Sequence, residues 1–168
     1  MIDSPGIPSA NETEEFFFEA ALATYAGNAK KISVGRLIDF GLEGWQGFEY
    51  RRRLFCYRDV WASAPKEDGM LERRSWGNTF ISYNGTVLWC MNYSGWSNPN
   101  DHNVLQVLKR GLRLAYTAKH FLGGRGVKTF CSADGYEYRN ELSLQRGFLE
   151  LERQGVPCDD YWSVCFWW

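Results

Sequence analysis

The side chains in this sequence that could carry out chemistry are one carboxylate and several phenols. Residues 45–61 are predicted to form a hairpin that turns at Arg52-Arg53. The expected pairs across it are Gln46 with Asp59, Phe48 with Tyr57 and Tyr50 with Phe55. Asp59 would then share a face with aromatic rings, where burial without a cationic partner favours the protonated form and prepares a carboxylate for acid–base catalysis. The more conservative interpretation is an Asp that caps a loop or pairs with Arg58.

A second hairpin, over residues 78–95, is the most strongly predicted element. Asn84-Gly85 can take positive φ at both central positions, which favours a tight type I′ turn. The expected pairs are Tyr83 with Thr86, Ile81 with Leu88, Phe80 with Trp89 and Thr79 with Cys90. One face of the second strand would carry Val87, Trp89, Met91 and Tyr93, and the other Leu88 and Cys90, as in a central strand covered on both sides. Asn92 interrupts this apolar run and needs hydrogen-bond partners or a cavity.

These residues predict an aromatic-lined cavity between the sheet and the helices. Its catalytic residues are expected to be Asp59 and Tyr93, and its ligand-binding residues Tyr25, Tyr57, Trp89, Asn92 and Arg125. Eight Trp, nine Tyr and eleven Phe, 17% of the chain, are enough to line a ligand site, although they could equally fill a core. The sequence leaves two functions open: a cofactor-independent enzyme acting by carboxylate and phenol chemistry on an apolar or aromatic substrate, and a non-catalytic ligand-binding module such as a sensor, sequestering or immunity protein.

Composition argues against several other classes of function. A net charge of −1 with 23% charged residues disfavours nucleic acid and anionic membranes as partners, and Arg51-Arg52-Arg53 is interpreted as a solvated turn rather than a phosphate site. The glycines at 123, 124 and 126 follow a helix instead of preceding one, so they do not form a phosphate-binding loop. Neither the two His nor the five Cys have metal-ligand spacing. We therefore expect no metal or other cofactor.

The cysteines and the hydropathy of the chain indicate its compartment. Cys56, Cys90 and Cys131 fall within predicted strands, which is typical of reduced thiols in the core of a cytosolic protein. No stretch approaches 18 apolar residues, and the N-terminus does not resemble a signal peptide. A cytoplasmic location is therefore expected. The terminal Phe166-Trp167-Trp168 would be exposed unless it docks on the body or on a second copy, which makes a homodimer a candidate assembly.

The remaining elements predict a single α+β domain over residues 11–168 after a mobile tail, 1–10. Asn11 and Glu14 fit a capping box for a helix over 12–26. A longer helix is expected from Asn100 or Asp101 to Leu122, with its core face formed by Val104, Leu105, Leu108, Gly111, Leu112, Ala115 and Tyr116. Strands over 128–132, 136–140, 148–153 and 161–168 would follow as an antiparallel meander. The fold class is thus an antiparallel sheet of about six to eight strands packed against one long and one shorter helix.

Short runs in a fixed order also carry a resemblance. They are Thr24-Tyr25-Ala26, Tyr57-Arg58-Asp59, the Trp-x-Met-Asn-Tyr-x-Gly motif at 89–95, Arg125-Gly126 and Tyr136-Glu137-Tyr138. With them, residues 14–168 resemble an uncharacterised bacterial domain family that occurs alone or after a helix-turn-helix DNA-binding module. The chain departs from the family pattern at Val127, where the family has Pro, and at its Phe-Trp-Trp ending, where the family has His-Gly-Gly. The resemblance implies no established reaction.

Overall fold

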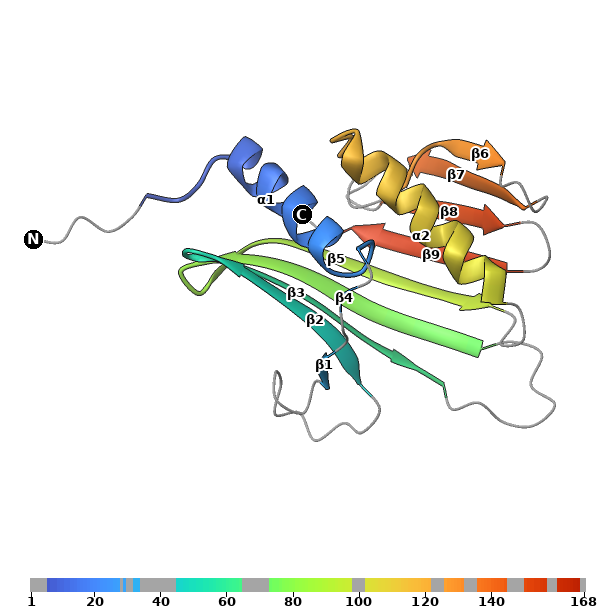
Figure 1. Cartoon of the computed structure of the whole chain (residues 1–168), viewed down its shortest axis with the longest axis horizontal. Helices are drawn as coiled ribbons and strands as arrows, with labels where there is room; N and C mark the ends of the chain where they lie inside the picture. Colours follow the sequence, from blue (N-terminus) through green and yellow to red (C-terminus); the bar gives the residue numbers. More distant parts are fainter. Residues whose placement is uncertain are drawn as a thin grey trace, which may run out of the picture.

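The computed structural model describes residues 6–27, 29, 32–33, 45–64, 73–97, 102–121, 126–131, 136–144, 150–156 and 160–166. Within them, nine strands form one antiparallel sheet with two helices on one of its faces (Figure 1). The helices are α1 (Ala10–Ala23) and α2 (His102–Thr117). The strands are β1 (Ile32–Ser33), β2 (Gln46–Arg52), β3 (Phe55–Ser63), β4 (Arg73–Tyr83), β5 (Thr86–Ser97), β6 (Thr129–Cys131), β7 (Glu137–Leu144), β8 (Glu150–Val156) and β9 (Asp160–Phe166).

The α+β class and the antiparallel sheet agree with the sequence prediction, whereas the finer description changes. The described strands number nine, because β1 adds a two-residue edge strand too short to show any alternation of residue types. The helices have 14 and 16 residues, so they are nearly equal in length rather than one long and one shorter. Within the part of the chain described, no helix is long and apolar enough to cross a membrane.

The sheet is built from two halves of the same topology. The strand order is β1-β2-β3-β4-β5-β9-β8-β7-β6. Each half contains a helix followed by a four-stranded meander, α1 with β2–β5 and α2 with β6–β9, and the first half has β1 as an additional edge strand between α1 and β2 in the sequence. The last strands of the two halves, β5 and β9, pair antiparallel at the centre, with Tyr93 opposite Val164. β3, β4 and β5 are therefore interior strands whose backbones are paired on both edges.

Aromatic rings of α1 join the sheet to α2. Phe16 stacks on Phe55 of β3 with ring centroids 4.6 Å apart. Phe17 lies edge-on to Trp89 of β5 at 5.3 Å and to Tyr116 of α2 at 5.1 Å. Because edge-to-face rings gain from both burial and quadrupole interaction, this cluster fixes α1 against both of its neighbours.

The start of α1 differs from the prediction by two residues. Ser9, not Asn11, is the N-cap: its Oγ accepts from the backbone N–H of Glu12 at 3.3 Å, and the Glu12 carboxylate accepts from the Ser9 N–H at 2.8 Å. The sequence contains both Ser-x-x-Glu and Asn-x-x-Glu at this point, so the capping-box pattern alone does not choose between them.

The core face of α2 also differs in one position. Val107 is buried, whereas Leu105 is 40% exposed. The apolar arc is therefore rotated away from Leu105, and the other predicted core residues, Val104, Leu108, Gly111, Leu112, Ala115 and Tyr116, are buried. Past the end of α2, Lys119 lies at the surface, where its ammonium group pairs with Glu15 at 2.8 Å.

The β4–β5 hairpin closes at Asn84-Gly85, as predicted, with φ angles of 47° and 83°. Tyr83 opposes Thr86, but a bulge beside Ile81 and Ser82 then shifts the register by one residue. The observed pairs are Ile81 with Trp89, Phe80 with Cys90 and Thr79 with Met91, in place of Leu88, Trp89 and Cys90. Trp89, Met91 and Tyr93 stay on the helix side, whereas Val87 moves to the opposite face and is 58% exposed. A bulge leaves no strong local sequence signal, which explains the error.

The β2–β3 hairpin turns one residue later than predicted, at Arg53-Leu54, where Arg53 has a φ of 54°. Phe48 therefore opposes Asp59 and Tyr50 opposes Tyr57, a shift of two residues from the predicted pairs. Because side chains alternate with a period of two along a strand, this shift leaves every residue on its predicted face.

A close contact between α2 and β7 gives a stability test. A Cβ atom on Gly111 would lie 2.8 Å from the ring of the fully buried Tyr138. Ala is a better helix former than Gly by about 1 kcal/mol, yet overpacking costs ~1–3 kcal/mol. We expect Gly111→Ala to lower the free energy of unfolding, measured by urea denaturation. In a Tyr138→Leu background the loss should shrink or change sign, and a gain of stability in the otherwise unchanged protein would contradict the close packing.

Candidate active site

Asp59 is a buried carboxylate on the helix side of β3. It lies between Phe48 of β2 and Thr79 of β4 in the register, and its side chain is 4% exposed. The register places it in the aromatic surroundings that the sequence predicted. It does not cap a loop or pair with Arg58, because successive residues of a strand point to opposite faces and Arg58 forms its ion pair on the other side.

Two hydroxyl groups donate hydrogen bonds to the Asp59 carboxylate. The Tyr93 hydroxyl lies 2.7 Å from Oδ1, and the Thr79 hydroxyl lies 3.1 Å from the same atom. Both donors come from neighbouring strands, Thr79 from β4 and Tyr93 from β5. The carboxylate is therefore held by neutral donors, which stabilise its charge less than a cation would.

Gly77 makes the contact between Tyr93 and Asp59 sterically accessible. Gly77 lies on β4 directly opposite Tyr93. A Cβ atom at position 77 would lie 2.5 Å from the Tyr93 hydroxyl and 2.7 Å from the Val60 carbonyl oxygen. The Tyr93 ring thus crosses β4 over the one residue type that leaves room for it, and reaches Asp59 on the next strand.

Burial sets the protonation behaviour of this cluster. It raises the pKa of Asp59 from 3.8 to about 6, while hydrogen bonds from Tyr93 and Thr79 oppose the shift. Burial and the neighbouring Asp59 charge raise the pKa of Tyr93 and of Tyr57 well above 10. The same two causes raise the pKa of Tyr25. The three phenols therefore stay neutral at physiological pH, and Asp59 titrates close to it.

Tyr25 joins the cluster from the segment that follows α1. Its ring lies edge-on to Phe48 and Trp61, and the ammonium group of Lys109 from α2 lies 5.1 Å from its centroid. The guanidinium group of Arg113, also on α2, donates two hydrogen bonds, of 2.9 and 2.7 Å, to the Ala26 carbonyl. α2 thereby fixes the segment that carries Tyr25.

The other predicted ligand-binding residues have different positions. Tyr57 lies next to Asp59 in the buried cluster, whereas Trp89 packs against Phe17 in the aromatic core. Asn92 lies opposite Asn78 on the face away from the helices, so it does not join Asp59. Arg125 lies outside the described residues. The predicted set is thus divided between the two faces of the sheet, because alternate residues of β5 point in opposite directions.

Sequence reasoning missed Thr79 and Gly77. Thr79 lies in the predicted hairpin and Gly77 directly before it, but their roles depend on the pairing of β3 with β4 and of β4 with β5. The signal that could have found them is the isolated glycine in a strand, which often marks the close approach of another group.

Cysteine and metal chemistry have little support among the residues described. Cys56 is buried, and burial raises the pKa of its thiol, so it stays a neutral thiol. Cys56 and Cys90 lie on the face away from the helices rather than in the helix-side core. No group of three or more His, Cys, Asp or Glu side chains within the described ranges could hold a metal ion.

Comparisons with protein-family models, with curated proteins and with solved structures found no match. The resemblance based on the short sequence runs therefore stays an expectation. The function must be inferred from the geometry of the residues themselves.

The raised pKa of Asp59 predicts an unusual pH dependence of stability. The folded state binds the Asp59 proton more tightly than the unfolded state, so this group lowers the free energy of unfolding as pH rises from about 4 to about 6. The loss should reach about 3 kcal/mol, from a shift of about two units at ~1.4 kcal/mol per unit. Asp59→Asn keeps an acceptor for Tyr93 and Thr79 but cannot ionise.

We therefore expect Asp59→Asn to gain stability relative to the unsubstituted protein between pH 4 and pH 7. Urea denaturation at each pH measures the free energy of unfolding of both proteins. In the difference between the two values, the contributions of all other titrating groups cancel. A difference that stays constant with pH would show that Asp59 has an ordinary pKa in the folded protein.

Proposed function

We propose that the protein binds a small apolar or aromatic molecule beside Tyr93 and moves a proton on it with the Asp59–Tyr93 pair, without a cofactor. The hydrogen bond of 2.7 Å between these side chains carries the proposal. General acid–base catalysis requires a titratable group within hydrogen-bond reach of the proton to be moved, with a pKa near the working pH. Burial raises the pKa of Asp59 toward the working pH. The Tyr93 hydroxyl, hydrogen-bonded to Asp59, would place the pair within reach of the proton on the ligand.

The exposure of the residues in the cluster supports different roles for them in this proposal. Asp59 is buried, whereas Tyr93 and Tyr25 are only partly buried. A ligand would therefore contact the phenol rings, with the carboxylate behind them. Flat, mostly apolar rings favour a ligand with an aromatic or apolar surface, and the Tyr93 hydroxyl is the polar group that would orient it.

The high pKa of Tyr93 constrains the proton transfer. A free phenolate would be costly there, so Tyr93 would accept a proton from the ligand as its own proton passes to Asp59. The ligand loses one proton, Asp59 gains one, and Tyr93 ends neutral as it began. Because the pKa of Asp59 is about 6, the protonated side chain can release that proton again at neutral pH.

A non-catalytic ligand-binding module is the second candidate, and one observation favours it. The donors to Asp59 are fully engaged within the fold, with Thr79 1% exposed. A buried network whose hydrogen bonds are all formed within the fold can have a purely structural role, which here would be to fix the packing of β3, β4 and β5. In that case the rings would bind a sensed or sequestered ligand without changing it.

The two candidates differ in what happens to the bound molecule. The protein is incubated with a metabolite extract, washed, and the retained compounds are identified by mass spectrometry before and after incubation. We expect a retained compound to be converted by the unsubstituted protein. Asp59→Asn should still retain it but convert it about 10²–10⁴-fold more slowly, the typical contribution of a general base.

Two phenol variants provide the matched comparison. Tyr93→Phe removes the hydroxyl group that contacts Asp59 and should slow conversion strongly. Tyr83→Phe removes a hydroxyl group from the same hairpin, where the Tyr83 ring packs against Phe55, and should leave conversion unchanged. Release of an unaltered ligand by the unsubstituted protein would leave the binding module, and failure to retain any compound would exclude both candidates.

A further inference from the structure

The face of the sheet away from the helices has a hollow of about 550 Å³ near the turns of the two hairpins. Its lining includes Arg51, Arg53, Arg58, Val60, Phe80 and Val87. Small-molecule sites typically have volumes of roughly 300–1,000 Å³. The hollow is separate from the Asp59 cluster, because residues 56, 58 and 60 of β3 alternate with 57 and 59 and point to the opposite side.

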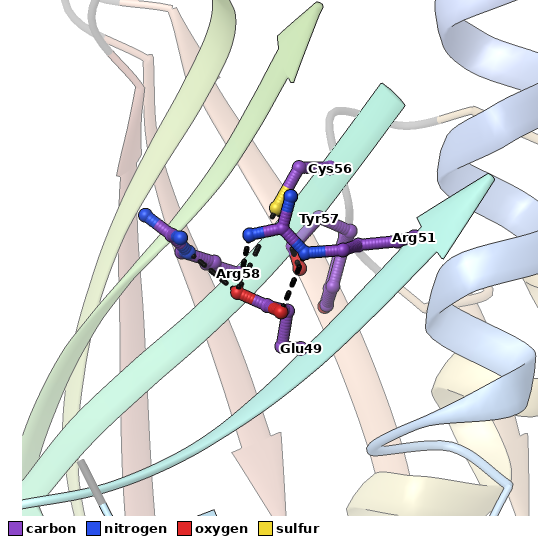
Figure 2. Close-up of polar contacts among 5 residues, drawn as sticks. All are labelled: Glu49, Arg51, Cys56, Tyr57 and Arg58. Atoms are coloured by element: carbon purple, nitrogen blue, oxygen red, sulfur yellow. Dashed lines mark hydrogen bonds and ion pairs between the residues drawn. The ribbon is translucent and has the colours of Figure 1, made fainter. Parts of the chain in front are cut away.

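A shared carboxylate holds two of the arginines in place. Figure 2 shows Glu49 between the side chains of Arg51 and Arg58. Arg51 donates to it from Nε at 2.7 Å, and Arg58 donates from Nε to the other carboxylate oxygen at 2.9 Å. The hydrogen bond from Arg51 is the main cause that lowers the pKa of Glu49, with Arg58 adding to it. Glu49 therefore stays ionised and fixes both guanidinium groups.

Positive charge exceeds negative charge around this hollow. Among the residues described, the three guanidinium groups of Arg51, Arg53 and Arg58 are balanced only by Glu49, which leaves two positive charges in excess there. Arg53 forms no ion pair with any described residue and is exposed. Arg52, between Arg51 and Arg53 in sequence, points to the helix side, where it pairs with Glu19. Alternation at the end of β2 thus places Arg51 and Arg52 on opposite faces of the sheet.

Apart from Ser82 and Asn84, the rest of the lining is mostly apolar. Val60 is 2% exposed and forms part of the buried floor, while Val87 and Leu54 are exposed at the rim. Cys56 adds a neutral thiol to the floor, since burial keeps it protonated. An occupant that matches this surface needs an apolar body and an anionic end.

We propose that this hollow binds a small organic carboxylate with an apolar body, the carboxylate held mainly by Arg53 and the apolar part packed over Val60 and Val87. Arg51 contributes the one guanidinium nitrogen, Nη1, that does not donate to Glu49. Guanidinium groups pair with carboxylates through two parallel hydrogen bonds, which suits this end of the ligand. The site goes beyond the Asp59–Tyr93 function and does not depend on it. β3 supplies both sites, one from each set of alternating residues.

A second copy of the chain fits this face poorly. A symmetric dimer formed through the hollow would bring the arginines of one copy close to those of the other. Like charges in such an interface cost binding free energy. A small anion instead neutralises the excess, which is why we assign the hollow to a ligand.

Decanoate, used below the concentration at which it forms micelles, is the probe. Isothermal titration calorimetry should show decanoate binding at least about tenfold more tightly than decanol or acetate, because decanol lacks the carboxylate and acetate lacks the long apolar chain. Arg53→Gln should weaken binding about tenfold by removing the unpaired guanidinium group. Val87→Asp should abolish binding by adding a charge at the apolar rim.

Two variants on the helix side serve as controls. Arg52→Gln removes the same charge from the adjacent residue and should leave decanoate binding within about twofold of the unsubstituted protein. Asp59→Asn should also leave it unchanged, and loss of binding there would place decanoate on the helix face and overturn the proposal. Equal affinity for decanol and decanoate, or the absence of decanoate binding, would also overturn the proposal. A dimer in sedimentation velocity that Val87→Asp converts to monomer would overturn it as well. Circular dichroism confirms that each variant is folded.

Discussion

A buried carboxylate that accepts hydrogen bonds from two hydroxyl groups constrains the centre of this fold. Asp59 lies on β3, its donors Thr79 and Tyr93 lie on β4 and β5, and the Tyr93 ring can reach it only because Gly77 has no side chain. Three adjacent strands must therefore keep one register for the charge to be hydrogen-bonded at all. An unpaired buried carboxylate would cost much more than either hydrogen bond contributes.

The pairing of strands explains how that register is kept. β3, β4 and β5 are paired on both edges, and β5 meets β9 where the two halves of the sheet join. On one side, Phe16 and Phe17 of α1 pack against rings of β3 and β5. Slippage by one residue would move Asp59 to the outer face and Arg58 into the aromatic core. The large penalty for burying an unpaired guanidinium group makes the alternation of β3 strongly specific.

The sequence was sufficient for features that depend on local chemistry or on the period of a strand. Asn84-Gly85 specifies its turn by itself, and the aromatic company of Asp59 was predicted correctly although the β2–β3 register was wrong by two residues. The one-residue shift at the β4–β5 bulge had a larger effect, because it moved Val87 to the opposite face. The contact of Tyr93 with Asp59 over Gly77 spans three strands, and no pattern within a single strand encodes it.

Glu49 and Asp59 lie on opposite faces of the sheet, and their environments shift their pKa values in opposite directions. Glu49 lies between two guanidinium groups that lower its pKa, whereas burial raises that of Asp59. Asn at position 59 could accept the same two hydrogen bonds without the desolvation of a charge, so packing alone gives no reason for a carboxylate there. Groups whose environments move their pKa values in opposite directions often divide structural and chemical roles. On this basis we propose that Glu49 has the structural role of positioning its arginines, and that the proton of Asp59 takes part in the proposed function.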